Sequence, residues 1–337
     1  MTSSTPLKFL MPGWFSVVMG LSGLSLAWHR AAGVLGDMAN GLALVVGGVA
    51  AAVFVVLLVA SALRLSRHPA ALAEDLKHPV RHAFVAALPV ATLLLAAVGV
   101  ALFGAHPMLN ALWWAGALTQ LWATVWVLGR WLAPLPNASP GQTGLWPGVT
   151  PVLLIPVVGN VVSPLAGLPL GHEVWASAQM GIGTFFWPIV MGLVLVRRMA
   201  HSPLPDRILP AWFITIAPPA VIGSVLTLYE APLALPLGMW GVAVFILVWL
   251  APLARRIAGQ PFGIGFWGLS FPLAALAALT LRLAELHGGG GLQTAGVLLL
   301  AVASMVILWL GFATVRGLRD GSLLAPEPLA SIQPVSA

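Results

Sequence analysis

Charge is scarce in this sequence, and cysteine is absent from it. Only 7% of the 337 residues are charged and 60% are hydrophobic, and the mean hydropathy is +0.99. A soluble domain usually carries roughly a quarter charged residues, so the composition indicates an integral membrane protein. The lack of cysteine excludes disulfides, thiolate metal sites and cysteine nucleophiles.

The basic residues outnumber the acidic ones, which gives a net charge of +6. They occur singly or in pairs between apolar runs, so they form no patch that would bind nucleic acid. We therefore expect the lipid bilayer, and not a nucleic acid, as the surroundings of this chain.

Ten apolar runs approach the roughly 20 residues that a helix needs to span the hydrocarbon core. We predict an all-α integral membrane protein in which residues 1–320 form one transmembrane domain. The tail at residues 321–337 is rich in Pro, Ser and Ala and is predicted to be disordered and cytoplasmic. The ten predicted spans are approximately residues 9–29, 39–63, 81–104, 108–133, 147–166, 173–196, 208–228, 232–253, 263–286 and 293–317.

The basic residues predict the orientation of these spans. Thirteen of the fifteen Lys and Arg residues fall on the same side as the N-terminus, and only Arg30 and Arg282 fall on the other side. Cytoplasmic loops are enriched in Lys and Arg. We expect a multi-pass protein of the cell inner (plasma) membrane with both termini in the cytoplasm.

The missing charges also narrow the function. The centres of the spans contain no Asp, Glu, Lys or Arg, although charge inside a membrane usually marks a functional site. Both lysines, Lys8 and Lys77, lie outside the spans, which excludes a retinal-type Schiff base. The eight histidines lie at span ends or in loops, without the pairing that haem needs. We expect no enzyme activity, no cofactor and no metal site.

Prolines recur in alternate spans. The spans pair into five hairpins, and Gly20 and Gly23 in the first span stand where the first helices of the other hairpins have prolines. Proline removes a backbone hydrogen bond and kinks a helix, and the freed groups need partners inside a bilayer. The pattern favours an inner ring of odd helices and an outer ring of even helices. Alternatively, these prolines only reflect their higher frequency in membrane helices. The prolines concerned are Pro89, Pro156, Pro218, Pro219 and Pro272.

The polar groups inside the odd helices are small, and most are hydroxyls such as that of Ser16. They are compatible with hydrogen bonds between helices or with a weakly polar lumen from which an ion leaves readily. Glu285 follows Arg282 by one helical turn, which predicts a local ion pair at the outer end.

Five landmarks in this order resemble the tellurite-resistance and dicarboxylate transporter family, which includes bacterial TehA proteins, yeast malate and sulfite transporters and the slow anion channel of plant guard cells. The resemblance covers nearly the whole chain. The landmarks are GWFSVVMGLSGLSLAW (residues 13–28), HPVRHAFVAALPVAT (78–92), the Gln120 segment GALTQLW, APP (217–219) and FGIGFWGLSFPLA (262–274).

The resemblance implies ten helices arranged as five hairpins around a central pore, with proline-kinked odd helices lining the pore, in a homotrimer. It also implies that Phe271, beside Pro272, blocks the pore. Two residues depart from the family pattern: Ser16 stands where glycine is common, and the region of Val18 lacks a proline. These departures concern gating more than the fold.

Two functions follow from the resemblance. The first is a channel for small monovalent anions such as chloride and nitrate, with a neutral pore closed by Phe271. The second is a secondary carrier or exporter of a C4-dicarboxylate, sulfite or tellurite, with or without a link to protons. The absence of acidic residues from the span centres argues against strict proton coupling.

Overall fold

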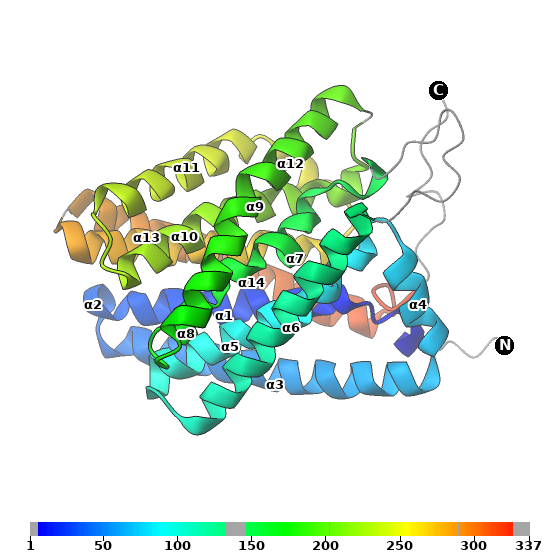
Figure 1. Cartoon of the computed structure of the whole chain (residues 1–337), viewed down its shortest axis with the longest axis horizontal. Helices are drawn as coiled ribbons and strands as arrows, with labels where there is room; N and C mark the ends of the chain where they lie inside the picture. Colours follow the sequence, from blue (N-terminus) through cyan, green and yellow to red (C-terminus); the bar gives the residue numbers. More distant parts are fainter. Residues whose placement is uncertain (1–5, 133–145, 202, 289, 326–337) are drawn as a thin grey trace.

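The computed structural model describes residues 6–132, 146–201, 203–288 and 290–325 (Figure 1), and this part of the chain is helical without a β-strand. Most of the predicted tail lies outside the described residues. The α-helices are α1 (Ser16–Arg30), α2 (Ala32–Leu35), α3 (Asp37–Arg67), α4 (Pro69–Lys77), α5 (Ala87–Phe103), α6 (Pro107–Leu132), α7 (Leu154–Val158), α8 (Pro164–Gly167), α9 (Glu173–Ala200), α10 (Ala217–Leu228), α11 (Ala234–Leu250), α12 (Leu253–Ala258), α13 (Ser270–His287) and α14 (Gly290–Arg319).

Seven helical stretches of the described chain are long and apolar enough to cross a membrane. The other three predicted spans are helical but shorter or interrupted. They correspond to α1, to the broken stretch Pro151–Gly167 and to α11. The membrane class is therefore supported, and ten crossings remain a prediction. The seven stretches are Asp37–Arg67, Arg81–Phe103, Pro107–Leu132, Glu173–Ala200, Asp206–Leu228, Ile264–His287 and Gly290–Arg319.

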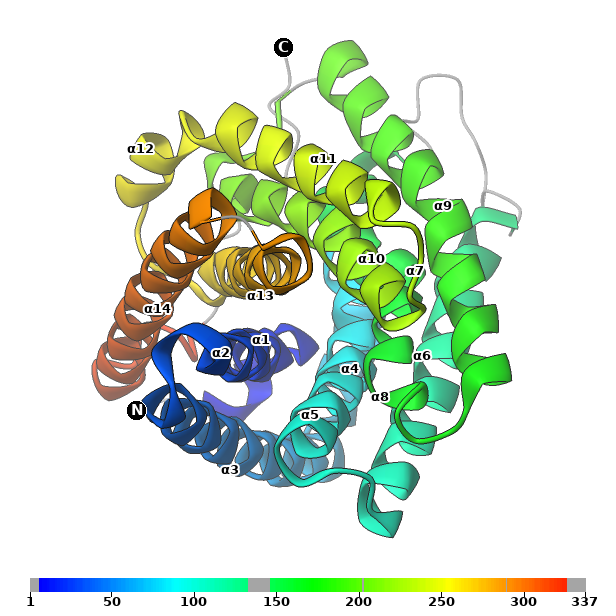
Figure 2. The ribbon, with the colours of Figure 1, turned by 90° about the vertical axis from the view of Figure 1, so that its left-hand side faces the viewer.

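Burial divides these seven stretches into two groups. In three of them, 72–78% of the most apolar window is buried, and in the other four only 22–39% is buried. Figure 2 shows α1, α5, α10 and α13 toward the inside of the bundle, with α3, α6, α9, α11 and α14 around them. The buried stretches are Arg81–Phe103, Asp206–Leu228 and Ile264–His287.

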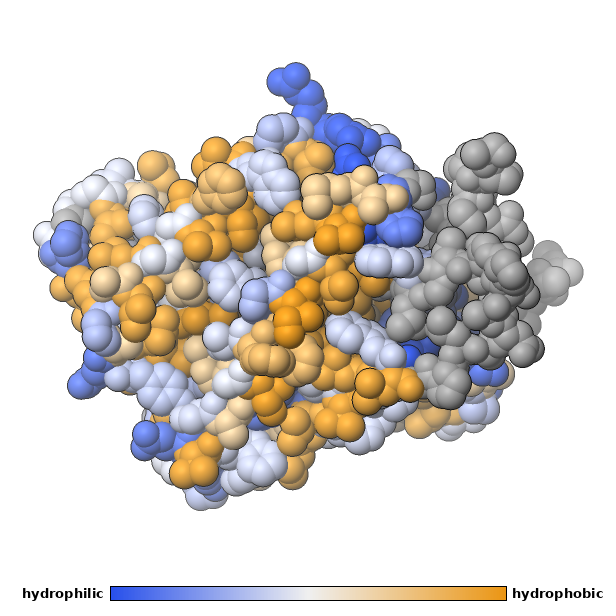
Figure 3. Space-filling model, turned by 45° about the horizontal axis from the view of Figure 1, so that its top comes forward, coloured by the Kyte–Doolittle hydropathy of each residue, from blue (hydrophilic) through white to orange (hydrophobic). Residues whose placement is uncertain are grey.

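Large apolar side chains cover the outside of the bundle. Val45, Phe185 and Phe312 of the outer helices expose 63%, 65% and 70% of their surface. Orange apolar residues spread over most of the face in Figure 3, and most blue hydrophilic residues lie toward the ends of the long axis. A surface of this kind is stable against lipid and not against water.

Side chains from two outer helices form hydrogen bonds with the interrupted stretch Pro151–Gly167, which includes α7 and α8. Gln120 Nε2 and Thr124 Oγ1 of α6 donate hydrogen bonds to the carbonyl oxygen of Pro156, at 3.1 and 2.7 Å. Asn160 Nδ2 donates to Thr124 Oγ1 at 2.7 Å, and Gln179 Nε2 of α9 donates to Asn160 Oδ1 at 3.1 Å. Irregular backbone at membrane depth is stable only where such partners replace water.

Candidate functional site

Each inner helix changes its pitch at an equivalent point. A 3₁₀ segment comes first and an α-helix continues it without a break, as in η8 (Ile264–Leu269) followed by α13. The same order occurs in the other inner helices, whose 3₁₀ segments are η2 (Pro12–Phe15), η3 (Arg81–Ala86), η5 (Pro151–Leu153) and η7 (Asp206–Ile216).

The prolines mark this change of pitch. Pro89, Pro156, Pro219 and Pro272 are each the third residue of their α-helix, and Val18 holds that position in α1. Proline is tolerated in the first turn of an α-helix, because its missing N–H has no intrahelical partner there. The sequence predicted kinks in the middle of continuous helices. The structure instead places the prolines where a 3₁₀ segment becomes an α-helix.

Hydroxyl groups at the same points bond to the backbone of their own helix. Ser16 Oγ donates to the carbonyl of Gly13 at 2.7 Å, Ser270 Oγ to that of Trp267 at 2.6 Å and Thr215 Oγ1 to that of Trp212 at 2.6 Å. Side-chain bonds of this kind satisfy backbone groups locally and bend helices. These hydroxyls therefore support the change of pitch rather than linking neighbouring helices.

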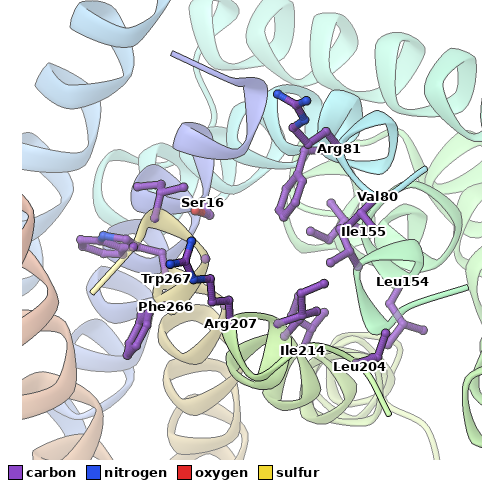
Figure 4. A pocket seen from close by; sticks show the side chains of 18 of the residues that line it. Ser16, Val80, Arg81, Leu154, Ile155, Leu204, Arg207, Ile214, Phe266 and Trp267 are labelled. Atoms are coloured by element: carbon purple, nitrogen blue, oxygen red, sulfur yellow. The ribbon is translucent and has the colours of Figure 1, made fainter. Parts of the chain in front are cut away.

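A cavity of about 930 Å³ lies between the 3₁₀ segments, and we call it the vestibule. Figure 4 shows side chains from several inner segments around it, among them Ile155, Ile214 and Trp267. Of the predicted pore residues, Ser16, Pro218, Phe271 and Pro272 line the vestibule. Gly20, Pro89, Pro156 and Pro219 are not among its lining residues, although each belongs to an inner helix.

Beside α1, α10 and α13, the vestibule ends at the level of Phe271. Its lining includes no residue of α1 beyond Met19, of α10 beyond Val221 or of α13 beyond Pro272, whereas beside α7 it continues to Val162 at the end of η6 (Gly159–Val162). Beyond that level Leu276 and Leu279 of α13 have no exposed surface. In the part of the chain that the structure describes, Phe271 therefore lies at the end of the vestibule that borders α1 and α13.

Two glycines of α1 shape the space around Phe271. A Cβ atom added at Gly23 would lie 2.8 Å from Cδ2 of the Phe271 ring, and one added at Gly20 would lie 2.6 Å from Cβ of Ser270. Carbon atoms do not approach so closely without displacement. The ring of Phe271 therefore rests directly against the backbone of α1, and only glycine at position 23 leaves room for it.

Replacing Gly23 by alanine tests this contact. The added methyl group must push the Phe271 ring away from α1, and the open space beside the ring is the vestibule. For the anion channel that the resemblance implies, we expect the current to fall by about threefold, which corresponds to a barrier higher by about 0.7 kcal/mol. In a Phe271→Ala background the same change should have a much smaller effect, because the other close neighbour of the added methyl group is Cβ of Ala274, at 3.3 Å. Equal effects in both backgrounds would contradict the packing described here.

The other end of the vestibule is basic. Three arginines and two histidines line it, and no Asp or Glu is among its described lining residues. We call this group the basic mouth: Arg81, Arg197, Arg207, His78 and His201. Asp75 lies behind the basic mouth, and its carboxylate pairs with Arg81 at 3.0 Å and with buried Arg64 at 2.7 Å.

Arg207 differs from the other arginines of the basic mouth. Arg81 is paired with Asp75, and Arg197 Nε donates to the carbonyl of Trp146 at 3.1 Å. The neighbouring carboxylate, Asp206, is paired with Arg256 at 2.7 Å. Arg207 is exposed and has no carboxylate partner among the described residues. Figure 4 shows its side chain reaching into the opening of the vestibule.

His78 is held neutral at the basic mouth. Its Nδ1 accepts hydrogen bonds from the backbone N–H groups of Val80 and Arg81, both at 3.1 Å. Burial, together with the positive charge of Arg81, lowers the pKa of His78 to about 4, against the opposing effect of Asp75.

This shifted pKa predicts a pH dependence of stability. Between pH 6.5 and about 4 the unfolded chain binds a proton at His78 that the folded protein does not bind. The contribution of this group is therefore fully present above pH 6.5 and is lost as the pH falls toward 4. We expect the Tm of a His78→Gln variant to decline less than that of the wild type between pH 7 and pH 4.5 in thermal unfolding. Parallel declines would contradict the assignment.

At the opposite end, the predicted ion pair of α13 is confirmed. Arg282 Nη1 lies 2.8 Å from Glu285 Oε2, and both side chains are about 30% exposed (28% and 31%). Pairs as exposed as this one contribute little to stability.

The comparisons with known proteins agree with this geometry. The family model described as "SLAC1: Voltage-dependent anion channel" matches residues 10–315, which is most of the chain. The chain belongs to this family. Its match extends from the 3₁₀ segment before α1 to the last helix, so all the inner helices lie within it.

Several curated proteins are similar to the chain. The tellurite resistance protein TehA homolog of Haemophilus influenzae is 26% identical, over 93% of this chain and 92% of that protein. An uncharacterised transporter of Methanocaldococcus jannaschii is 27% identical, over 81% and 83%. The S-type anion channel SLAH2 of Arabidopsis thaliana is 22% identical, over 71% of this chain and 45% of that protein. The family is made of channels and transporters.

Sequence reasoning missed two features of the site. It noted Gly23 only as a substitute for proline, since a contact between two helices leaves no mark in one sequence. It counted Arg207 only as one of many cytoplasmic charges. The sequence shows an acidic neighbour, Asp206, and two arginines at 255 and 256. It does not show that Asp206 pairs with Arg256 and not with Arg207.

Proposed function

We propose that this protein is a channel that lets small monovalent anions, such as chloride and nitrate, cross the membrane passively. The observation that carries the proposal is the vestibule, with a basic mouth at one end and Phe271 closing the other. Phe271 acts as an apolar plug that closes the path by its size and by excluding water. Phe271 stands between Ser270 and Pro272, and none of these three residues carries a charge that would hold an ion tightly. Weak binding of this kind suits fast conduction.

The architecture belongs to the same proposal. Ten spans form five hairpins, with the odd helices around the path and the even helices facing lipid. The burial of the inner stretches supports this arrangement. Met11 and Leu323, near the two ends of the described chain, both line the vestibule, which supports a shared side for the two termini. In this proposal that side is the cytoplasmic side of the inner (plasma) membrane. The protein assembles as a homotrimer with one path in each protomer.

Anion preference has two sources in this proposal. The basic mouth concentrates anions near the vestibule, although salt screens this effect over about 8 Å. The apolar walls then favour anions that lose their water easily, because the hydroxyl group of Ser16, which lines the vestibule, is already bonded to a backbone carbonyl. We expect nitrate to pass more readily than chloride.

The test is the anion current of the purified protein in planar bilayers. A channel gives a current that follows the electrochemical gradient, with a reversal potential that shifts toward that of the more permeant anion. A carrier of a dicarboxylate, sulfite or tellurite instead gives saturable uptake in liposomes and no unitary currents. Saturable uptake without current would overturn the channel and leave a carrier built on the same helices.

A further inference from the structure

The vestibule is much larger and more apolar than chloride or nitrate requires. Its volume of about 930 Å³ falls in the range of roughly 300–1,000 Å³ that is usual for sites of organic ligands. Aromatic side chains make up part of its wall, and aliphatic ones such as Ile155, Ile214 and Leu204 make up much of the rest. The aromatic residues are Phe84, Trp146, Phe262, Phe266, Trp267 and Phe271.

One charged group at the opening has no carboxylate partner among the described residues. This group is Arg207, which lines the vestibule, and the adjacent carboxylate of Asp206 is paired with Arg256. A guanidinium presents two parallel N–H groups that match a planar carboxylate. The described lining contains no acidic residue that would repel such a group.

We propose that the vestibule binds an amphiphilic carboxylate, with the carboxylate on Arg207 and an apolar chain along the wall toward Phe271. A ligand in this position occupies the space through which inorganic anions reach Phe271, so it blocks the path. The binding step stands on the cavity alone, whereas the block rests on the proposed function. The two parts are therefore measured separately.

The binding experiment uses fatty carboxylates short enough to dissolve in water. Labelled butyrate, hexanoate and octanoate are titrated onto the protein in lipid nanodiscs, with empty nanodiscs as the blank. Each added methylene group should raise affinity by about fourfold. Octanamide, which has the same chain without charge, should bind at least about tenfold more weakly than octanoate.

Three variants locate the site. Arg207→Gln should weaken octanoate binding at least about tenfold. Arg198→Gln should leave it unchanged, because Arg198 is an exposed arginine of α9 that does not line the vestibule. Gly265→Trp should abolish binding, because Gly265 lines the vestibule and open space surrounds its Cβ position. All three residues are exposed, so we expect the variants to fold, and weaker binding would then reflect a change at the site.

The outcomes separate the two proposals. Saturable binding that follows these variants, with octanoate reducing the anion current of the wild type, supports both parts. Binding without any anion current supports the site and rejects the channel. Equal uptake of octanoate and octanamide, or octanoate uptake that Arg207→Gln leaves unchanged, would show partition into lipid and overturn the inference.

Discussion

Replacing Phe271 by alanine should raise the anion current at least about tenfold, which corresponds to lowering the barrier by about 1.4 kcal/mol. Phe271 is only 8% exposed, and it lies where the α13 part of the vestibule lining ends. Alanine would remove the ring and leave a gap between α1 and α13 that water can enter. The measurement is the current in planar bilayers, with chloride and then nitrate on both sides.

The control for this variant is a second phenylalanine. Phe266 also lines the vestibule, but it belongs to η8 and packs against Phe262, with ring centroids 5.4 Å apart. Phe266→Ala should change the current much less than Phe271→Ala. Similar currents from the two variants would mean that any loss of volume opens the path, and Phe271 would lose its special role.

Removing the carboxylate of Asp75 should cost about 3 kcal/mol of stability. Asp75 is 1% exposed, and it joins Arg64 at the end of α3 to Arg81 at the start of η3. Arg64 also donates from Nε to the carbonyl of Lys8 at 3.0 Å. Asp75→Ala leaves the Arg64 charge buried without a counter-charge, which is far more costly than the loss of an exposed pair. Thermal and denaturant unfolding in detergent measure the difference.

Asp206 provides the matched control. It pairs with Arg256 at 2.7 Å, close to the Asp75–Arg64 distance, but the two side chains are 48% and 57% exposed. Asp206→Ala should therefore cost less than about 1 kcal/mol. A double change of Asp75 to leucine and Arg64 to methionine should recover much of the stability, because it removes both buried charges. Equal losses for the two alanine variants would show that burial of the Asp75 pair is unimportant.

The sequence predicted which helices are buried better than it predicted their shape. Prolines at 89, 219 and 272 marked stretches that are mostly buried in the structure. The 3₁₀ segments before them could not be predicted, because hydropathy reports only whether a residue suits lipid. Pitch depends on which carbonyl each N–H reaches, and side chains such as Ser16, Ser270 and Thr215 influence that choice locally.

The site was predicted in part. Phe271, Ser16, Pro218 and Pro272 do line one cavity. Gly23 and the ring of Phe271 are in contact although they are almost 250 residues apart in the chain. A single sequence gives no information about a contact of this kind. Arg207 has no carboxylate partner among the described residues, because Asp206 pairs with Arg256 instead. Which arginine pairs with Asp206 is visible only in the structure.

In each inner helix, the position of the junction between the 3₁₀ and α segments determines how far the rest of the helix is rotated and shifted along its axis. A 3₁₀ helix advances about 2.0 Å and turns about 120° per residue, whereas an α-helix advances about 1.5 Å and turns about 100°. Moving the junction by one residue therefore rotates the rest of the helix by about 20° and shifts it by about 0.5 Å. In α13 the junction lies at Ser270, one residue before Phe271. A step of one residue at that point would turn the Phe271 ring relative to the glycines of α1 without bending the helix.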